Sequence, residues 1–239
     1  MHAPHLLNLR ELGYLPLQSG GSTQPKAYLR SDTLARLTTE GMQALVDYGL
    51  RTIIDLRWPE EVQAGSYEHL LDGHPLRRIH ISLLDDDATT WRARGYHPEP
   101  KDQLNIFVLE NTQPRIRRVL QAIAQAPVGT LLFHCHSGKD RTGLISTLLL
   151  ALAGVEQEAM VRDYTLSEDR LREDYLADRS DLSPKEIHQR LSCPPTQVVN
   201  TLSYLHDHHG STMDYLRHIG LAESDIRSLK QRLTHQGVK

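Results

Sequence analysis

Cysteine is scarce in this sequence, and the two that occur, Cys135 and Cys193, are too few for a disulfide framework in 239 residues. The net charge is −3 and no basic block is present, so electrostatics give no support for a nucleic-acid partner. An isolated cysteine with histidine and arginine beside it is better interpreted as a nucleophile in a reducing compartment. These scarcities argue against a disulfide-stabilised small domain.

Long hydrophobic runs are also missing. The longest, at residues 148–153, is far shorter than the roughly 20 residues that a membrane-spanning helix needs. Residues 1–5 contain no basic stretch followed by a long apolar one, so no cleavable signal peptide is predicted. We therefore expect a cytoplasmic protein without an integral membrane segment, and export without a cleavable signal stays open.

What the sequence does contain is an ordinary globular composition, with 39% hydrophobic and 24% charged residues. This is enough apolar material for a core without help from disulfides or metal. We predict a single domain over residues 1–239, with a core at about 8–175 and a helical C-terminal part at about 183–236. The oligomeric state stays open.

Hydrophobic periodicity predicts alternating strands and helices. Thr38 or Thr39 offers a hydroxyl cap for a helix that Gly49 ends. The β-branched run at 52–56 lacks alternation, which is typical of a strand buried on both faces. The expected strands are 28–31, 52–56, 78–81 and 129–134, and the expected helices are 39–48, 105–126 and 143–153, with a polar loop at 8–13 and mostly helix after 156. This order predicts an α/β fold with a central, mostly parallel sheet of about four to five strands, flanked by helices and followed by extra C-terminal helices.

Residues 134–143 read His-Cys-His-Ser-Gly-Lys-Asp-Arg-Thr-Gly and link the last predicted strand to a strongly apolar helix. The N–H groups of such a loop, together with the helix dipole, form a cradle for an anion, which predicts a phosphate site. Gly138 permits backbone conformations that other residues avoid, and Arg141 offers a planar fork for two phosphate oxygens. The predicted phosphate-binding residues are His136, Ser137, Gly138, Lys139, Asp140 and Arg141.

Cys135 is expected to point into this cradle, where the positive surroundings that bind phosphate also favour the thiolate. A thiolate in line behind phosphorus can displace an alcohol and form a phosphocysteine, which water then hydrolyses. Thr142 can donate a hydrogen bond to the departing sulfur, and His134 would orient the loop without transferring a proton. The pattern predicts a cysteine-dependent phosphomonoester hydrolase that uses no metal or other cofactor.

Both chemical steps need a proton transfer, which one carboxylic acid on a separate loop can supply. Asp85, Asp86 and Asp87 follow a predicted parallel strand, at the sheet edge where ligands gather in α/β folds. We choose Asp85 among them, with Asp140 inside the loop as a further candidate. For any single one of the three, a solvated acidic turn is the alternative.

The run at 134–143 resembles the signature of the protein tyrosine phosphatase superfamily. Its Lys139–Asp140 variant is similar to a bacterial group of tyrosine and phosphoinositide phosphatases that includes secreted mycobacterial and listerial enzymes. Further segments that resemble this group are 8–13, 28–32, 55–57 and 163–167, so the resemblance covers about residues 8–175.

The resemblance implies a phosphatase fold of that superfamily, with Cys135 as nucleophile and Arg141 as the phosphate-binding arginine. It associates Lys139 with a phosphoinositide headgroup and Asp140 with acid–base steps. Phosphorylated proteins, with phosphotyrosine first and phosphoserine or phosphothreonine second, and phosphoinositides are the implied substrates. Relatives tend to carry a proline before the acid loop, whereas residues 80–85 here read His-Ile-Ser-Leu-Leu-Asp, which leaves the general acid open.

Several residues have a structural interpretation instead. Arg57 is interpreted as an anchor for Asp55 or Glu11 rather than as a ligand contact, and Lys139 could be a solvated cation. The histidine-rich run at 206–209 is interpreted as a solvated helix end rather than as a metal site, because no second ligand group of suitable spacing occurs.

Two other function classes compete with a phosphatase. One is a catalytically inactive module that binds phosphate or phosphoinositide, which the presence of nucleophile, arginine and acids disfavours. The other is a sulfur-transfer or arsenate-reducing enzyme, which would need a second reactive cysteine. Cys193 could fill that place or act as a resolving thiol, but it is interpreted as inert.

Overall fold

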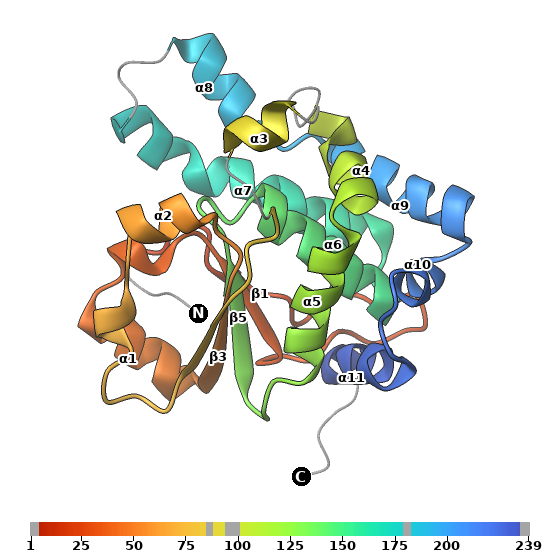
Figure 1. Cartoon of the computed structure of the whole chain (residues 1–239), viewed down its shortest axis with the longest axis horizontal. Helices are drawn as coiled ribbons and strands as arrows, with labels where there is room; N and C mark the ends of the chain where they lie inside the picture. Colours follow the sequence, from red (N-terminus) through yellow and green to blue (C-terminus); the bar gives the residue numbers. More distant parts are fainter. Residues whose placement is uncertain (1–4, 85–87, 94–100, 179–182, 235–239) are drawn as a thin grey trace.

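The structure is a computed structural model that describes residues 5–84, 88–93, 101–178 and 183–234, and these residues contain a five-stranded sheet (Figure 1). Its strand order is β1-β2-β5-β3-β4, in which β1 is antiparallel to β2 and the other neighbours are parallel. The strands are β1 (Arg10–Glu11), β2 (Tyr28–Ser31), β3 (Leu50–Asp55), β4 (Arg77–His80) and β5 (Thr130–His134). The predicted α/β class is confirmed, while β1 occupies a segment that was expected to be loop throughout.

Helices cover both faces of this sheet (Figure 1). The helices are α1 (Thr39–Tyr48), α2 (Pro59–Ala64), α3 (Ala88–Ala93), α4 (Lys101–Asn111), α5 (Gln113–Ala124), α6 (Asp140–Ala153), α7 (Gln157–Asp178), α8 (Pro184–Leu191), α9 (Pro195–His209), α10 (Thr212–His218) and α11 (Glu223–Thr234), with 3-10 turns η1 (Leu34–Arg36) and η2 (Glu68–Leu70). Along β5, Leu132 packs with α1 while Leu131 and Phe133 pack with α5 and α6, because successive side chains of a strand point to opposite faces. The central strand is therefore buried on both sides.

The ends of α1 follow the prediction. Thr38 Oγ accepts a hydrogen bond from the Gly41 N–H at 3.1 Å, which satisfies one of the unpaired donors of the first turn. Gly49 adopts a left-handed conformation with φ of 115°, and the chain then enters β3 directly.

The single helix predicted at 105–126 is wrong, because the structure has α4 and α5 in its place, separated at Thr112. Pro114 explains the break: proline has no N–H to donate, and its ring clashes with the carbonyl four residues earlier. Pro114 instead lies in the first turn of α5, where the missing donor costs nothing.

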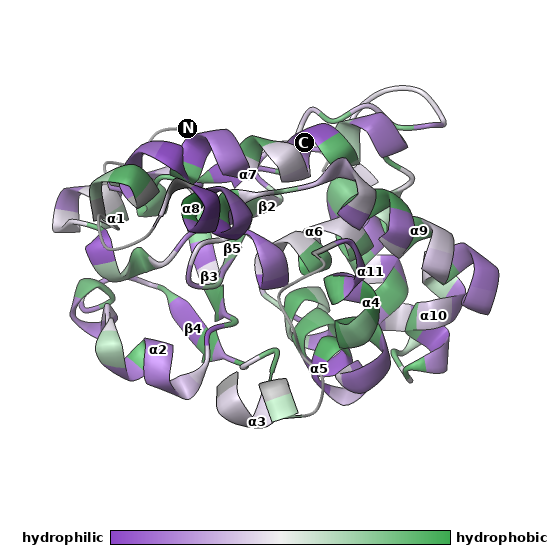
Figure 2. Cartoon of the chain, turned by 90° about the horizontal axis from the view of Figure 1, so that it is seen from above, coloured by the Kyte–Doolittle hydropathy of each residue, from purple (hydrophilic) through white to green (hydrophobic). Residues whose placement is uncertain are grey.

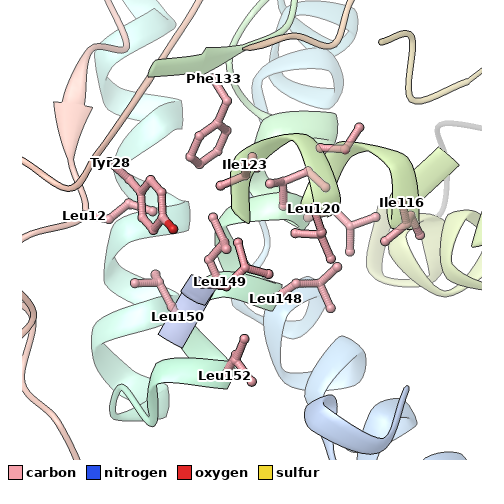
Figure 3. Close-up of a cluster of buried hydrophobic side chains, with 14 of the residues drawn as sticks. Leu12, Tyr28, Ile116, Leu120, Ile123, Phe133, Leu148, Leu149, Leu150 and Leu152 are labelled. Carbon is pink, nitrogen blue, oxygen red and sulfur yellow. The ribbon is translucent and has the colours of Figure 1, made fainter. Parts of the chain in front are cut away.

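Helix α6 lies in the centre of the molecule. Figure 3 shows Leu148 and Leu149 of α6 beside Leu120 and Ile123 of α5, and Leu150 and Leu152 belong to the same cluster. In Figure 2 the hydrophobic residues of α4, α5 and α6 gather where these helices meet. Burying nearly every side chain of α6 fixes its axis, and its N-terminus therefore lies at a fixed point just beyond the end of β5.

The described residues after 156 are mostly helical, as predicted, and several of these helices share the core of α6. Val198 and Leu205 of α9 and Leu229 of α11 belong to the same hydrophobic cluster as Leu148. Among the described residues, no helix combines the length and the hydrophobicity needed to cross a bilayer.

Candidate active site

The loop between β5 and α6 makes a sharp turn at Gly138. Its φ is +68°, a conformation that residues with a side chain rarely adopt. A Cβ atom there would lie 2.3 Å from the carbonyl oxygen of Ser31, so a side chain would also force the loop away from β2. Glycine is required at this position for both reasons.

Three consecutive carbonyl groups of this loop bond to segments outside it, which directs them away from its inner side. The carbonyl of His136 accepts from the Thr33 N–H at 2.9 Å, that of Ser137 from Asn8 Nδ2 at 3.0 Å, and that of Gly138 from Arg30 Nη2 at 2.8 Å. In a trans peptide the next N–H points opposite to the carbonyl. The N–H groups of residues 137–139 therefore point to the inner side, next to the N-terminus of α6, which is the geometry of an anion cradle.

Cys135 is the first residue after β5 and the first residue of this loop, and with 1% of its surface exposed it adjoins the main hydrophobic cluster. The ring of His134 bonds to the Cys135 carbonyl through Nδ1 at 3.2 Å and to the Tyr67 hydroxyl through Nε2 at 2.8 Å. Burial lowers the pKa of His134 to about 4. The imidazole is therefore neutral at pH 7 and holds the backbone at the start of the loop.

Arg141 has partners that the sequence analysis missed. Its guanidinium forms two hydrogen bonds with the Glu61 carboxylate, at 2.6 and 2.8 Å, and stacks over the Trp58 ring at 4.8 Å. Burial alone would raise the pKa of Glu61, but the hydrogen bonds and charge of Arg141 hold it below its usual value. The sequence at 58–61, Trp-Pro-Glu-Glu, is typical of a helix N-terminus, but nothing in it indicates a contact with Arg141.

Helix α2, which carries Glu61, is fastened by Arg57. Arg57 Nη1 donates to the carbonyls of Gly65 at 2.8 Å and Glu61 at 3.1 Å, and Nη2 pairs with Asp55 at 2.8 Å. The prediction that Arg57 anchors Asp55 is confirmed; Glu11 instead accepts a hydrogen bond from the Tyr48 hydroxyl. Arg57 thus links the end of β3 to the position of Arg141 through Glu61.

Lys139 does not lie solvated at a pocket mouth, since only 3% of it is exposed. Its ammonium donates to the Arg190 carbonyl at the end of α8 and lies 3.8 Å from Asp140 Oδ2. The ammonium is therefore buried and paired within the protein, and a contact with a lipid headgroup stays a prediction.

Thr142 and Asp140 each have a buried side-chain oxygen that forms no hydrogen bond within the described residues. For Thr142 this means that the expected bond to the Cys135 sulfur is not present here. Asp140 is part-exposed at the start of α6 and is the described candidate for the general acid. Asp85, Asp86 and Asp87 lie outside the described residues.

A cavity of about 530 Å³ lies against His136 and Ser137 of the loop. Its charged lining consists of four carboxylates and two arginines: Asp32, Glu60, Glu61, Asp174, Arg36 and Arg57. Three ion pairs involve this lining, Arg57 with Asp55, Arg36 with Asp174 at 2.6 Å and Glu61 with Arg141, and the lining carboxylates outnumber the lining arginines. Beyond the loop itself, the cavity is therefore acidic rather than basic.

The remaining candidates have structural surroundings. Cys193 is 2% exposed, and its thiol donates to the Leu191 carbonyl at 3.4 Å. In the run at 206–209, His208 stacks on Tyr204 of the preceding turn. In the part of the chain that the structure describes, no group of three or more metal-ligating side chains is placed to hold an ion.

The sequence matches the tyrosine phosphatase family over residues 1–235. It is 32% identical over 224 residues to a tyrosine-protein phosphatase of Nostoc commune, covering 88% of this chain and 75% of that protein. It is 29% identical to the triple specificity protein phosphatase PtpB of Mycobacterium tuberculosis, covering 61% of this chain and 62% of that protein. A crystal structure of P. aeruginosa TpbA matches 69% of this chain and 85% of that chain at 18% identity, and its TM-score of 0.33 is too low to add to the assignment.

Proposed function

This chain belongs to the tyrosine phosphatase family, and on that premise we propose that it hydrolyses phosphomonoesters through a covalent phosphocysteine at Cys135. The observation that carries the proposal is the outward direction of the loop carbonyls at His136, Ser137 and Gly138. It supports the proposal because it directs the N–H groups of residues 137–139 to the inner side of the loop, next to the N-terminus of α6 and two to four residues after Cys135. In the proposed complex, phosphate oxygens accept hydrogen bonds from these N–H groups and the phosphorus atom faces the Cys135 sulfur.

The reaction proceeds in two steps. The Cys135 thiolate attacks phosphorus, an S–P bond forms, and the P–O bond to the substrate breaks while an acid protonates the departing oxygen. Water then attacks the phosphocysteine, the S–P bond breaks, and inorganic phosphate leaves as the thiolate is restored. We assign the acid–base role to Asp140 among the described residues, and to Arg141, which pairs with Glu61, the neutralisation of charge on the transferring group.

Phosphotyrosine in proteins is the substrate class that the site supports best. The cavity beside the loop carries more carboxylates than arginines, which repels additional phosphates on the same substrate. Lys139, the residue associated with a phosphoinositide headgroup, is committed to a carbonyl of α8. Phosphoinositides therefore rank below phosphotyrosine, with phosphoserine and phosphothreonine as further substrates.

The first experiment measures release of phenol from a generic aryl phosphate under reducing conditions between pH 5 and 7. Cys135→Ser should abolish turnover, by about 10⁴-fold or more, while the loop still binds inorganic phosphate. Cys193→Ser is the matched control, because it removes the other buried thiol and should leave turnover close to that of the unsubstituted protein. A wild-type protein that binds phosphate and releases no phenol would instead be an inactive binding module.

The second experiment compares phosphotyrosine peptides with phosphoinositide vesicles at equal phosphate concentration. We expect kcat/KM to be higher for the peptides. Faster turnover of a polyphosphorylated inositol lipid would overturn the substrate ranking but not the chemistry at Cys135.

A further inference from the structure

Four buried polar side chains behind the loop form a closed hydrogen-bonded ring with two of its carbonyls. Arg30 of β2 donates to the Gly138 carbonyl at 2.8 Å and to Asp163 of α7 at 2.5 Å. Asp163 accepts from Arg10 of β1 at 2.6 Å, and Arg10 donates to the Asn8 side chain. Asn8 Nδ2 closes the ring on the Ser137 carbonyl at 3.0 Å.

The ring carries an excess of positive charge. It contains two guanidinium groups and one carboxylate, and all three groups are buried. Burial and the neighbouring Arg30 charge lower the pKa of Arg10 to about 10, which still leaves it protonated at pH 7. Burial would raise the pKa of Asp163, but the two arginines hold it below its usual value. Two further charged side chains lie next to the ring. Arg170 donates to the Leu9 carbonyl and adds a positive charge, and Asp32 accepts from the Asn8 N–H and adds a carboxylate.

The contact between α6 and α7 allows Asp163 to reach the two arginines. A Cβ at Gly143 would lie 3.1 Å from the Tyr164 ring and 3.7 Å from Arg30, so this glycine lets the two helices approach closely. Asp163 comes directly before Tyr164 and is carried to the back of the loop by that contact. The ring is therefore built from three separate elements that meet only in the folded chain.

We propose that Asn8 and Arg30 are positioning residues of the phosphate-binding loop, and that the excess positive charge of their ring favours the Cys135 thiolate and bound phosphate. This inference rests on the function proposed above. Without Arg30, the Gly138 carbonyl has no fixed donor and can turn inward, which would place a negative dipole where phosphate must bind. Because a small misplacement of binding groups costs a large factor in rate, the ring acts on catalysis without touching substrate.

Other charged or titratable groups also face the loop. Those on the loop and α6 are His136, Lys139, Asp140 and Arg141, and those packed against it are His134 of β5, Asp55 of β3 and Glu61 of α2. None of them changes in a substitution of Arg30. A difference between two variants of residue 30 therefore reflects the charge and hydrogen bonds of the ring and not those of the other groups.

Arg30→Gln and Arg30→Lys separate charge from position. The readouts are kcat/KM on an aryl phosphate and the pH at which iodoacetate inactivation of Cys135 is half-maximal. Arg30→Gln should lower kcat/KM by about 10²-fold and raise the pH of half-maximal inactivation by about 1 pH unit. Arg30→Lys keeps the charge but offers one nitrogen in place of the two that bond Asp163 and Gly138, so kcat/KM should fall while the midpoint stays close to wild type.

Arg232→Gln is the matched control, since Arg232 also clamps backbone carbonyls, those of Pro127 and Gly129, at the opposite end of β5. It should lower the thermal midpoint without changing the inactivation midpoint. If Arg30→Gln does not fold, Asn8→Ala removes one loop contact without removing charge and should lower kcat/KM about 10-fold at an unchanged inactivation midpoint.

Values of kcat/KM for the Arg30 and Asn8 variants that match that of Arg232→Gln would overturn the positioning role, and an inactivation midpoint of Arg30→Gln that matches that of Arg232→Gln would overturn the charge effect. That outcome differs from failure of the proposed function. In the first case wild type turns over and Cys135→Ser does not; in the second, wild type itself is inactive.

Discussion

Two buried aspartates lie on either side of the strand that leads into the loop, and each is held between two arginines. On one side Asp55 of β3 pairs with Arg57 and Arg78, at 2.8 and 2.9 Å. On the other side Asp163 of α7 pairs with Arg10 and Arg30, at 2.6 and 2.5 Å. The two groups have the same charge pattern, and they differ in what they fasten.

The Asp55 group fastens a neighbouring helix. Asp55 and Arg57 are two residues apart, and Arg57 extends to the carbonyls of α2. The Asp163 group fastens the loop itself, through partners more than 130 positions apart in the chain. The local pair of Asp55 and Arg57 thus orients Glu61, the partner of Arg141. The long-range Asp163 group instead orients the peptides of the loop itself.

Asparagine substitutions should give the largest effects, because breaking a buried ion pair leaves unpaired charge in the interior. We expect Asp163→Asn to lower the free energy of unfolding by about 5 kcal/mol and Asp55→Asn by about 3 kcal/mol. The difference arises because Arg57 retains the Thr33 hydroxyl and two carbonyls as acceptors, whereas Arg30 retains only loop carbonyls. Urea unfolding at pH 7 measures both values, and the reverse order would contradict the comparison.

The Asp55 group should be the one that responds to mild acid. His134 lies 3.7 Å from Asp55, and burial lowers its pKa to about 4, whereas the unfolded chain protonates histidine near pH 6.5. Between these values the unfolded state binds more protons, so the folded state loses stability as pH falls from about 6.5 to 4, by about 3 kcal/mol in total.

Urea unfolding between pH 4.5 and 7.5 tests this slope, which His134→Gln should reduce. The low pKa values of Asp55 and Asp163 act in a different window, because their stabilisation is lost only as pH falls below about 4. A slope in His134→Gln equal to that of wild type would assign the acid response elsewhere.

Substitutions of two glycines with positive φ test whether activity depends on the loop position that the Asp163 group fixes. Gly138→Ala should lower kcat/KM by about 10²-fold, because the added methyl would meet the Ser31 carbonyl and displace the loop. Gly154→Ala is the control: its φ is +79° and its Cβ would meet nothing within 4 Å. Both should lose about 1 kcal/mol of stability from backbone strain, and only the first should lose activity. Equal kcat/KM values for Gly138→Ala and Gly154→Ala would show that the loop can shift without loss of activity.

Glu61→Gln should have the smallest effect of this set. The amide still accepts one hydrogen bond from Arg141 but loses the charge-assisted pair, so we expect kcat/KM to fall about 10-fold. Gln63→Ala, on the exposed side of the same helix, is the control. A larger loss than in Gly138→Ala would mean that the Asp55 side controls the site more strongly than the Asp163 side.

Much of the fold could be predicted from local patterns. The run at 52–56 has no alternation because both of its faces are buried, and the cap at Thr38 and the stop at Gly49 follow from hydrogen-bond needs at helix ends. The helix break at Thr112 was missed although Pro114 signals it. β1 was missed because a two-residue strand carries no periodicity.

The candidate site divides in the same way. The loop at 134–143 was found because its residue types and spacing are local. Glu61 and Trp58 could not be connected with Arg141, since their contact depends on how α2 is placed against α6. Lys139 was expected to face ligand, and only the packing of α8 shows where its ammonium lies.

By itself the sequence determined the alternation of strands and helices and the loop that ends in Gly138, because propensity, capping and glycine geometry act within a few residues. Only the tertiary structure decided which groups turn the loop carbonyls outward and which arginines surround each buried aspartate. Buried polar groups must find partners, and those partners are supplied by whichever segments the packing brings together, however distant in the chain.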